Sequence, residues 1–167
     1  MNLNSYRKIT SLNKDIVQCR ACPRLVEFRE AVARKKRKQF EAWDYWGKPV
    51  PGYGEPGASL LLTGLAPAAH GGNRTGRVFT GDKSADFLVR CLHDVGIANQ
   101  PNSDSLDDGL ELINAYMTPV LKCVPPGDKP KPDELKQCAH YLSAELILLK
   151  NVKCILALGK IAFDACL

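Results

Sequence analysis

The stretch from Ser59 to Asp82 reads SLLLTGLAPAAHGGNRTGRVFTGD and joins an apolar run to a long loop rich in glycine. The run 59–64 is apolar and ends at a glycine, which is the pattern of a short strand buried on both faces of a parallel sheet. In α/β folds, ligands bind beyond the carboxyl ends of such strands. We therefore expect a functional site in the loop that follows Gly64.

Outward from this strand, apolar runs and helical patterns alternate along the chain. The predicted strands are 113–120 and 153–159, and the predicted helices are 12–32 with a break at 19–23, 82–95, 132–149 and 160–167. This alternation predicts a single α/β domain over residues 1–167, a three-layer α/β/α sandwich with a short parallel sheet. Because the chain ends soon after a strand of buried type, we expect the last strand of the sandwich to lie beyond Leu167.

The composition is that of an ordinary folded protein, with 45% hydrophobic and 25% charged residues. No apolar stretch is long enough to span a membrane, and residues 1–8 lack the apolar run of a secretion signal. We expect a cytoplasmic monomer without membrane contact. The net charge is +5, and residues 34–38 form an uninterrupted basic run, RKKRK. Such a run attracts polyanions such as DNA, although a solvated helix face explains it equally well.

Seven cysteines are many for a chain without a secretion signal, and metal or cluster ligation explains some of them better than disulfides do. Cys19 and Cys22 form a CxxC pair at a helix entrance, whereas Cys123 and Cys138 lie in a loop and in the next helix. Four thiolates suit either Zn²⁺ or a [4Fe–4S] cluster, and the spacing leaves the metal open. The other three lie in apolar, periodic segments and are expected in the core: Cys91, which shares a helix side with Phe87, Leu88 and Leu92, together with Cys154 and Cys166.

The loop after Gly64 combines small residues with polar ones. Its glycines allow the backbone to approach a planar ligand closely. It has neither the GxxxxGK[ST] pattern of a phosphate-binding loop nor the GxGxxG spacing of a dinucleotide site. Asp82 stands at the entry of the next helix, where the simplest interpretation of its side chain is a helix N-cap.

Three segments of the chain resemble one known family. Residues 64–82 closely resemble the first active-site motif of the family 5 uracil-DNA glycosylases, the type-B enzymes. Residues 19–25, CRACPRL, and residues 122–130, KCVPPGDKP, continue the match. The sister family 4 carries an acidic residue where Leu65 stands and an asparagine where Pro119 stands, so the resemblance is to family 5.

The resemblance implies a repair enzyme that removes uracil, and possibly other deaminated bases, from DNA. It implies Asp82 as the catalytic residue and Phe79 as the aromatic side chain that stacks on the flipped base. It also implies a structural [4Fe–4S] cluster on Cys19, Cys22, Cys123 and Cys138. The other residues expected around the base are Gly64, Leu65, Ala66, Pro67, Ala68, His70, Gly71, Asn73 and Asp128.

Two departures from the family pattern bear on activity. Family members often carry asparagine where Asp128 stands, and a carboxylate there either alters the pocket's base selection and electrostatics or only hydrogen-bonds the loop. The family's second motif, a loop with a histidine that hydrogen-bonds the leaving base, is expected beyond Leu167. Since loss of one such donor costs about 10²–10³ in rate, we expect weak or no activity from residues 1–167 alone. The alternatives are a non-catalytic iron–sulfur DNA-binding fragment and a zinc-stabilised nucleic-acid module.

Overall fold

The fold is built on a short sheet whose central strands are β2 (Leu60–Gly64) and β3 (Ala115–Pro119). The computed structural model describes residues 3–167 and gives the strand order β1-β3-β2-β4. β2 runs parallel to β3 and to β4 (Cys154–Ala157), which confirms the three predicted strands and the α/β class. β1 (Tyr53–Gly54) pairs antiparallel with β3. It was not predicted, because two residues inside a loop rich in glycine and proline carry no strand pattern.

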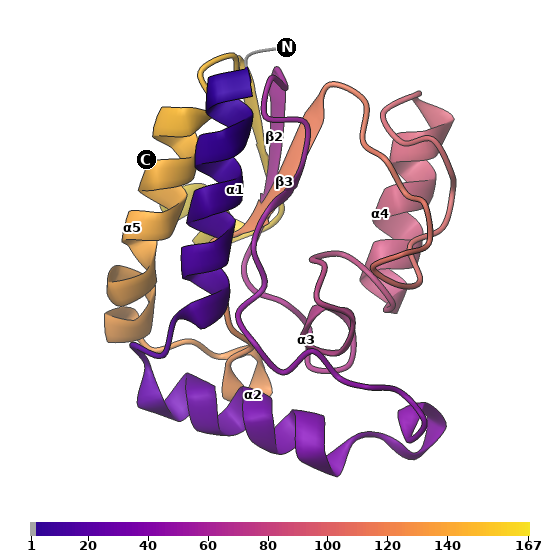
Figure 1. Cartoon of the computed structure of the whole chain (residues 1–167), viewed down its shortest axis with the longest axis vertical. Helices are drawn as coiled ribbons and strands as arrows, with labels where there is room; N and C mark the ends of the chain where they lie inside the picture. Colours follow the sequence, from indigo (N-terminus) through magenta and orange to yellow (C-terminus); the bar gives the residue numbers. More distant parts are fainter. Residues whose placement is uncertain (1–2) are drawn as a thin grey trace.

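Successive leucines of β2 face opposite sides of the sheet, because side chains alternate along a strand. Leu61 packs with Ile9 and Leu149, on the side covered by α1 (Leu3–Gln18) and α5 (Pro132–Leu148). Leu62 packs on the other side with Val89 and Leu92 of α4 (Lys83–Asp94). Figure 1 shows these helices on either side of the strands. The predicted three-layer sandwich is thus confirmed.

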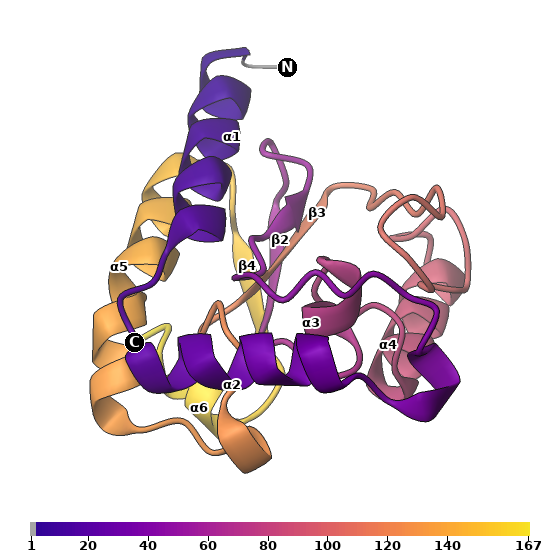
Figure 2. The ribbon, with the colours of Figure 1, turned by 60° about the horizontal axis from the view of Figure 1, so that its bottom comes forward.

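The carboxyl ends of the parallel strands are covered by a helix that crosses beneath them. This is α2 (Pro23–Lys35), which begins with a proline in its first turn and lies beside the short helix α3 (Gly72–Thr75) in the loop after β2 (Figure 2). The remaining elements are the short 3₁₀ helices η1 (Lys38–Phe40) and η2 (Pro126–Asp128) and the helix α6 (Lys160–Asp164). The helix break predicted at 19–23 therefore separates two helices that run in different directions.

The structure corrects several predictions about the core. In α4 the buried side chains are Ala85, Val89 and Leu92, whereas Phe87 is 74% exposed and Cys91 is exposed. The apolar residues of this helix are spread too widely around its axis for all of them to face the sheet.

The strand β4 is also less buried than its apolar sequence predicted. It lies at the edge of the sheet, and Cys154, Ile155 and Leu156 are all exposed. Cys166, just after α6, is partly buried. Of the three cysteines expected in the core, none is fully buried, because two lie on solvent-facing positions and the third at the end of a short helix.

Among residues 3–167, no helix has both the length and the apolar character that crossing a membrane requires.

Candidate active site

Asp82 lies at the start of α4, where its side chain caps the helix. Its Oδ1 atom accepts hydrogen bonds from the backbone N–H groups of Ser84 and Ala85, both at 3.0 Å. The predicted N-cap is confirmed. Because one oxygen makes both cap bonds, the position of the second, Oδ2, is fixed close to Gly71. The cap thus holds a carboxylate oxygen against the glycine-rich loop.

Asp82 borders an open groove of about 380 Å³ at the carboxyl ends of the strands. The loop after β2 forms one wall, and residues near η1 form another. Asp128 lies on the groove as well, so two carboxylates face the same space. The full lining is Arg37, Gln39, Phe40, Ala68, Ala69, His70, Gly71, Gly81, Asp82, Lys83 and Asp128.

Arg74 fixes the shape of this loop from inside. Its guanidinium donates to the carbonyl oxygens of His70 at 2.7 Å and Gly81 at 2.8 Å, which belong to opposite ends of the groove wall. The same guanidinium lies between the rings of Phe40 and Trp43, with its Cζ atom 3.9 Å and 4.1 Å from the ring centroids. The aromatic segment after the basic run is therefore attached to the glycine-rich loop through one buried arginine.

His70 lines the groove and is held by a tyrosine. Its Nδ1 atom is 2.9 Å from the hydroxyl of Tyr45. Burial lowers the pKa of His70, and the positive charges of Arg37 and Arg74 lower it further. His70 is therefore a neutral hydrogen-bonding group at physiological pH rather than a cation.

The other predicted base-contacting residues lie behind the groove lining. Gly64 and Leu65 continue the sheet, because their carbonyls accept hydrogen bonds from the N–H groups of Val120 and Leu121. Phe79 lies directly against Gly64, where a β-carbon would come within 2.6 Å of its ring, and has the unusual φ of +50°. Such a backbone strain at a non-glycine residue is typical of functional loops.

The rest of this set has structural contacts. Asn73 is buried and donates from Nδ2 to the carbonyl of Arg29 at 3.2 Å, which ties the loop to α2. Ala66 packs on the cluster of side chains around Leu25, and Pro67 lies beside Gly72. Asn73, Ala66 and Pro67 thus support the loop from behind.

On the catalytic role that the family resemblance implies for Asp82, we expect Gly71→Ala to lower the rate of base release by roughly 10²-fold, because displacing a catalytic group by about 1 Å costs that much. A β-carbon at position 71 would overlap Oδ2 of Asp82, so the carboxylate must move. Single-turnover release of the base measures the effect. Gly57→Ala is the matched control, since its nearest neighbour is 3.9 Å away. Equal rates for the two variants would contradict the proposed position of Asp82.

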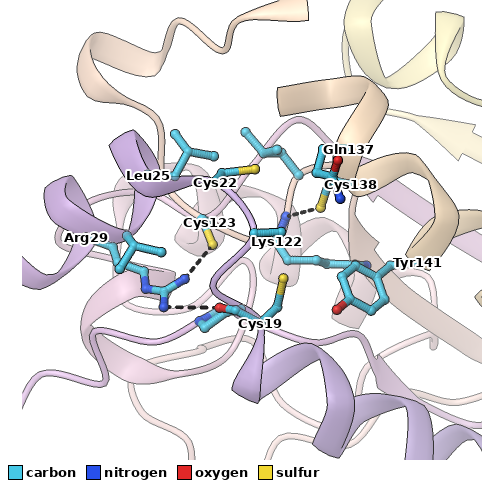
Figure 3. Close-up of a pocket in the computed structure, with 13 residues that line it drawn as sticks. Cys19, Cys22, Leu25, Arg29, Lys122, Cys123, Gln137, Cys138 and Tyr141 are labelled. Atoms are coloured by element: carbon cyan, nitrogen blue, oxygen red, sulfur yellow. Dashed lines mark hydrogen bonds between the residues drawn. The ribbon is translucent and has the colours of Figure 1, made fainter. Parts of the chain in front are cut away.

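The second constellation is formed by the cysteines of the two predicted pairs. Cys19 and Cys22 flank the entrance of α2, Cys123 lies in the loop after β3, and Cys138 lies in α5. All of them line one enclosed pocket, and Figure 3 shows their sulfur atoms pointing into a common space. The structure therefore brings together all the cysteines predicted as ligands. Within residues 3–167, however, no three His, Cys, Asp or Glu side chains lie close enough together to hold a single metal ion.

Two donors point at the sulfur atoms of this pocket. Arg29 donates from Nη1 to Sγ of Cys123 at 2.9 Å, and the backbone N–H of Lys122 donates to Sγ of Cys138 at 3.3 Å. Burial raises the pKa of the Cys138 thiol to about 12 and also raises that of Cys123. Binding of a metal or cluster here would require these thiols to lose their protons.

Sequence reasoning missed several residues of both sites. Arg37, Gln39 and Phe40 line the groove, although the sequence showed only a basic run and an aromatic after it. Tyr45 and Arg29 make their contacts across long distances in the chain, to His70 and Cys123. The basic run was the only sequence signal for Arg37, Gln39 and Phe40. No local pattern indicates the contacts of Tyr45 and Arg29.

An α/β fold with a carboxylate-bearing groove at its strand ends and a separate four-cysteine pocket is the arrangement of an enzyme that binds its ligand at the strand ends. Residues 51–167 match the family model described as uracil DNA glycosylase superfamily. The chain belongs to this superfamily.

Within the superfamily, the chain is more similar to type-5 than to type-4 enzymes. The chain is 50% identical over 152 residues to the type-5 uracil-DNA glycosylase of Thermus thermophilus, covering 91% of this chain and 68% of that protein. It is 48% identical over 160 residues to the type-5 enzyme of Mycobacterium tuberculosis, covering 95% of this chain and 60% of that protein. The type-4 enzyme of Sulfurisphaera tokodaii is 28% identical over 124 residues, covering 74% and 50%. The preference for family 5 over family 4 is confirmed, and the chain spans roughly two thirds of the length of its type-5 relatives.

Proposed function

We propose that this protein is a DNA-repair glycosylase that hydrolyses the N-glycosidic bond of uracil, and of other deaminated bases, and leaves an abasic site. The observation that carries the proposal is the Asp82 carboxylate, fixed by its own helix cap beside an open groove. The type-5 relatives supply the substrate class, since their names state uracil-DNA glycosylase. The substrate partner is DNA that contains such a base.

The groove residues suit the chemistry of base removal. A target base leaves the duplex before its glycosidic bond becomes accessible. As the bond breaks, positive charge develops on the deoxyribose, and the carboxylate of Asp82 stabilises it and orients the attacking water. Neutral His70, held by Tyr45, is positioned to hydrogen-bond within the groove. The predicted stacking of Phe79 on the extruded base, worth about 1–3 kcal/mol, stays a proposal, because its ring lies against Gly64 behind the groove lining and the base must reach past that lining.

We further propose that the four-cysteine pocket holds a [4Fe–4S] cluster on Cys19, Cys22, Cys123 and Cys138. The donor set is all thiolate, and the N–H groups of Arg29 and Lys122 directed at two sulfurs fit a negatively charged cluster. When bound, the cluster supplies a cross-link between α2, the loop after β3 and α5, rather than a step of the reaction. Iron and acid-labile sulfide in anaerobically purified protein would distinguish it from zinc.

The basic run adjoins the groove. Arg37 lines the groove with Asp82, and Lys35, Lys36 and Lys38 surround the adjoining hollow. Because the positive side chains begin where the groove ends, we propose that they bind the phosphates next to the extruded base. This favours the DNA-contact interpretation of residues 34–38 over a merely solvated helix face.

We expect replacement of Lys35 and Lys38 by glutamine to weaken DNA binding for all sequences and to flatten its salt dependence. Each phosphate that the protein no longer neutralises lowers the slope of log K against log [salt] by roughly 0.9. Fluorescence anisotropy over a series of salt concentrations measures this slope. Lys150→Gln with Lys153→Gln, an equal change of charge near the opposite ends of the strands, is the control. An unchanged slope in the first variant would remove this surface from the DNA path.

The principal test compares binding with base release on one uracil-containing duplex. The glycosylase proposal requires free uracil and an abasic site, whereas the non-catalytic alternative requires salt-sensitive binding without either. We also propose that residues 1–167 belong to one domain and that the protein works as a monomer, in the cytoplasm with the DNA it repairs.

A further inference from the structure

Arg29 is a buried cation that forms no ion pair within residues 3–167. The residue is 2% exposed and lies in the middle of α2. Its guanidinium donates to Sγ of Cys123 at 2.9 Å and to the carbonyl of Cys19 at 3.2 Å, while its Nε atom is buried without a partner. Both of its acceptors belong to the cysteine pocket.

Two carboxylates near α2 are already paired with other arginines, and Glu27, on the helix itself, is exposed. Glu30 accepts from Arg20 at 2.6 Å, and Glu134 accepts from Arg24 at 2.8 Å. Within residues 3–167, no carboxylate forms an ion pair with Arg29. A buried guanidinium without a counter-charge costs several kcal/mol, so this position calls for a negative group in the pocket.

The main chain of Arg29 is held so that its side chain stays in place. Its carbonyl accepts the hydrogen bond from Nδ2 of Asn73, which belongs to the glycine-rich loop. The guanidinium therefore faces the sulfur atoms from a fixed turn of α2, as Figure 3 shows. A preorganised donor of this kind loses little side-chain entropy when the negative group binds.

We propose that Arg29 is the counter-cation of the cysteine-bound cluster and sets its reduction potential and its retention. This inference rests on the cluster proposed above. Four thiolates contribute more negative charge than an iron–sulfide core contributes positive, so the bound site is net negative and balances the guanidinium. A buried positive charge and an N–H···S bond favour the reduced, more negative cluster, and so they raise the potential.

The test uses the iron-loaded protein and three variants. Arg29→Gln should lower the reduction potential measured by protein-film voltammetry and should speed loss of iron to a chelator by about 10–100-fold. Arg29→Lys keeps the charge, so its reduction potential and its rate of iron loss should lie between those of Arg29→Gln and those of the natural protein. Arg90→Gln is the control for loss of one positive charge, because Arg90 is exposed on α4 and does not line the pocket. Circular dichroism checks the fold of each variant.

A measurement on the natural sequence covers the case in which Arg29→Gln does not fold. Electron spin-echo spectroscopy of the reduced cluster, in protein labelled with ¹⁵N-arginine, should show a ¹⁵N coupling that disappears in Arg29→Lys. Two results would overturn the role of Arg29 but not the cluster. One is the absence of that ¹⁵N coupling in the iron-loaded protein. The other is an equal reduction potential and equal iron retention in the natural protein, Arg29→Gln and Arg29→Lys. A protein without iron would overturn the cluster as well.

Discussion

We expect replacement of Asp82 by asparagine to lower the rate of uracil release by roughly 10²–10⁴-fold, the usual contribution of a positioned acid–base group. The reason is loss of the negative charge that faces the developing positive charge on the sugar. Asparagine caps helices as well as aspartate does, so the start of α4 and the stability of the fold should be unchanged. Single-turnover release from a uracil-containing duplex, on the protein encoded by the complete reading frame, measures the rate.

Asp82→Ala separates the two functions of this side chain. It removes the charge and also the cap bonds to Ser84 and Ala85, so it should lower the free energy of unfolding by about 1 kcal/mol in addition to the loss of activity. Denaturant unfolding gives the stability of both variants. If Asp82→Asn released uracil at the natural rate, Asp82 would be only a helix cap.

Replacement of Cys138 by serine should remove most of the bound iron and should lower the temperature of unfolding. Cys138 is buried in α5, and its sulfur lies across the pocket from those of Cys19 and Cys22 in the segment before α2, so this replacement would remove the proposed cross-link between that segment and α5. Because binding free energy at a structural site adds to folding free energy, the change appears as instability. Iron analysis and calorimetry on anaerobically purified protein measure both effects.

Cys91→Ser provides the comparison for this prediction. Cys91 is exposed on α4 and does not line the pocket, so its replacement should change neither iron content nor unfolding temperature. Equal iron content in the two variants would exclude Cys138 as a ligand. Zinc in place of iron in the natural protein would keep the cross-link but change its chemistry.

The strands and helices that make the fold could be predicted because each one carries its own pattern. Residues 59–64 predicted β2, and Asp82 predicted the start of α4, since a buried apolar run and an N-cap are local signals. Burial was less predictable: Cys91 and Cys154 stand in apolar surroundings in the sequence but face solvent. Which side of a helix or strand is covered depends on its neighbours in space, and the sequence does not specify those neighbours locally.

The site could be predicted in part for the same reason. Asp82, His70 and Asp128 were named from motifs and do line the groove together. Phe40 and Arg29 were missed, because Phe40 contacts Arg74 and Arg29 contacts Cys123, and each contact joins segments that are distant in the chain. The structure therefore adds the wall of the groove and the surroundings of the cysteines to what motifs alone indicate.

The most direct test of the proposed activity is release of free uracil from a duplex that carries a single deoxyuridine. It uses the iron-loaded protein encoded by the complete reading frame, and the same duplex with thymine is the comparison. We predict free uracil and an alkali-sensitive abasic site at the deoxyuridine, and no product from the thymine duplex. Tight, salt-sensitive binding to both duplexes without release of uracil from either would contradict a glycosylase and leave a DNA-binding protein.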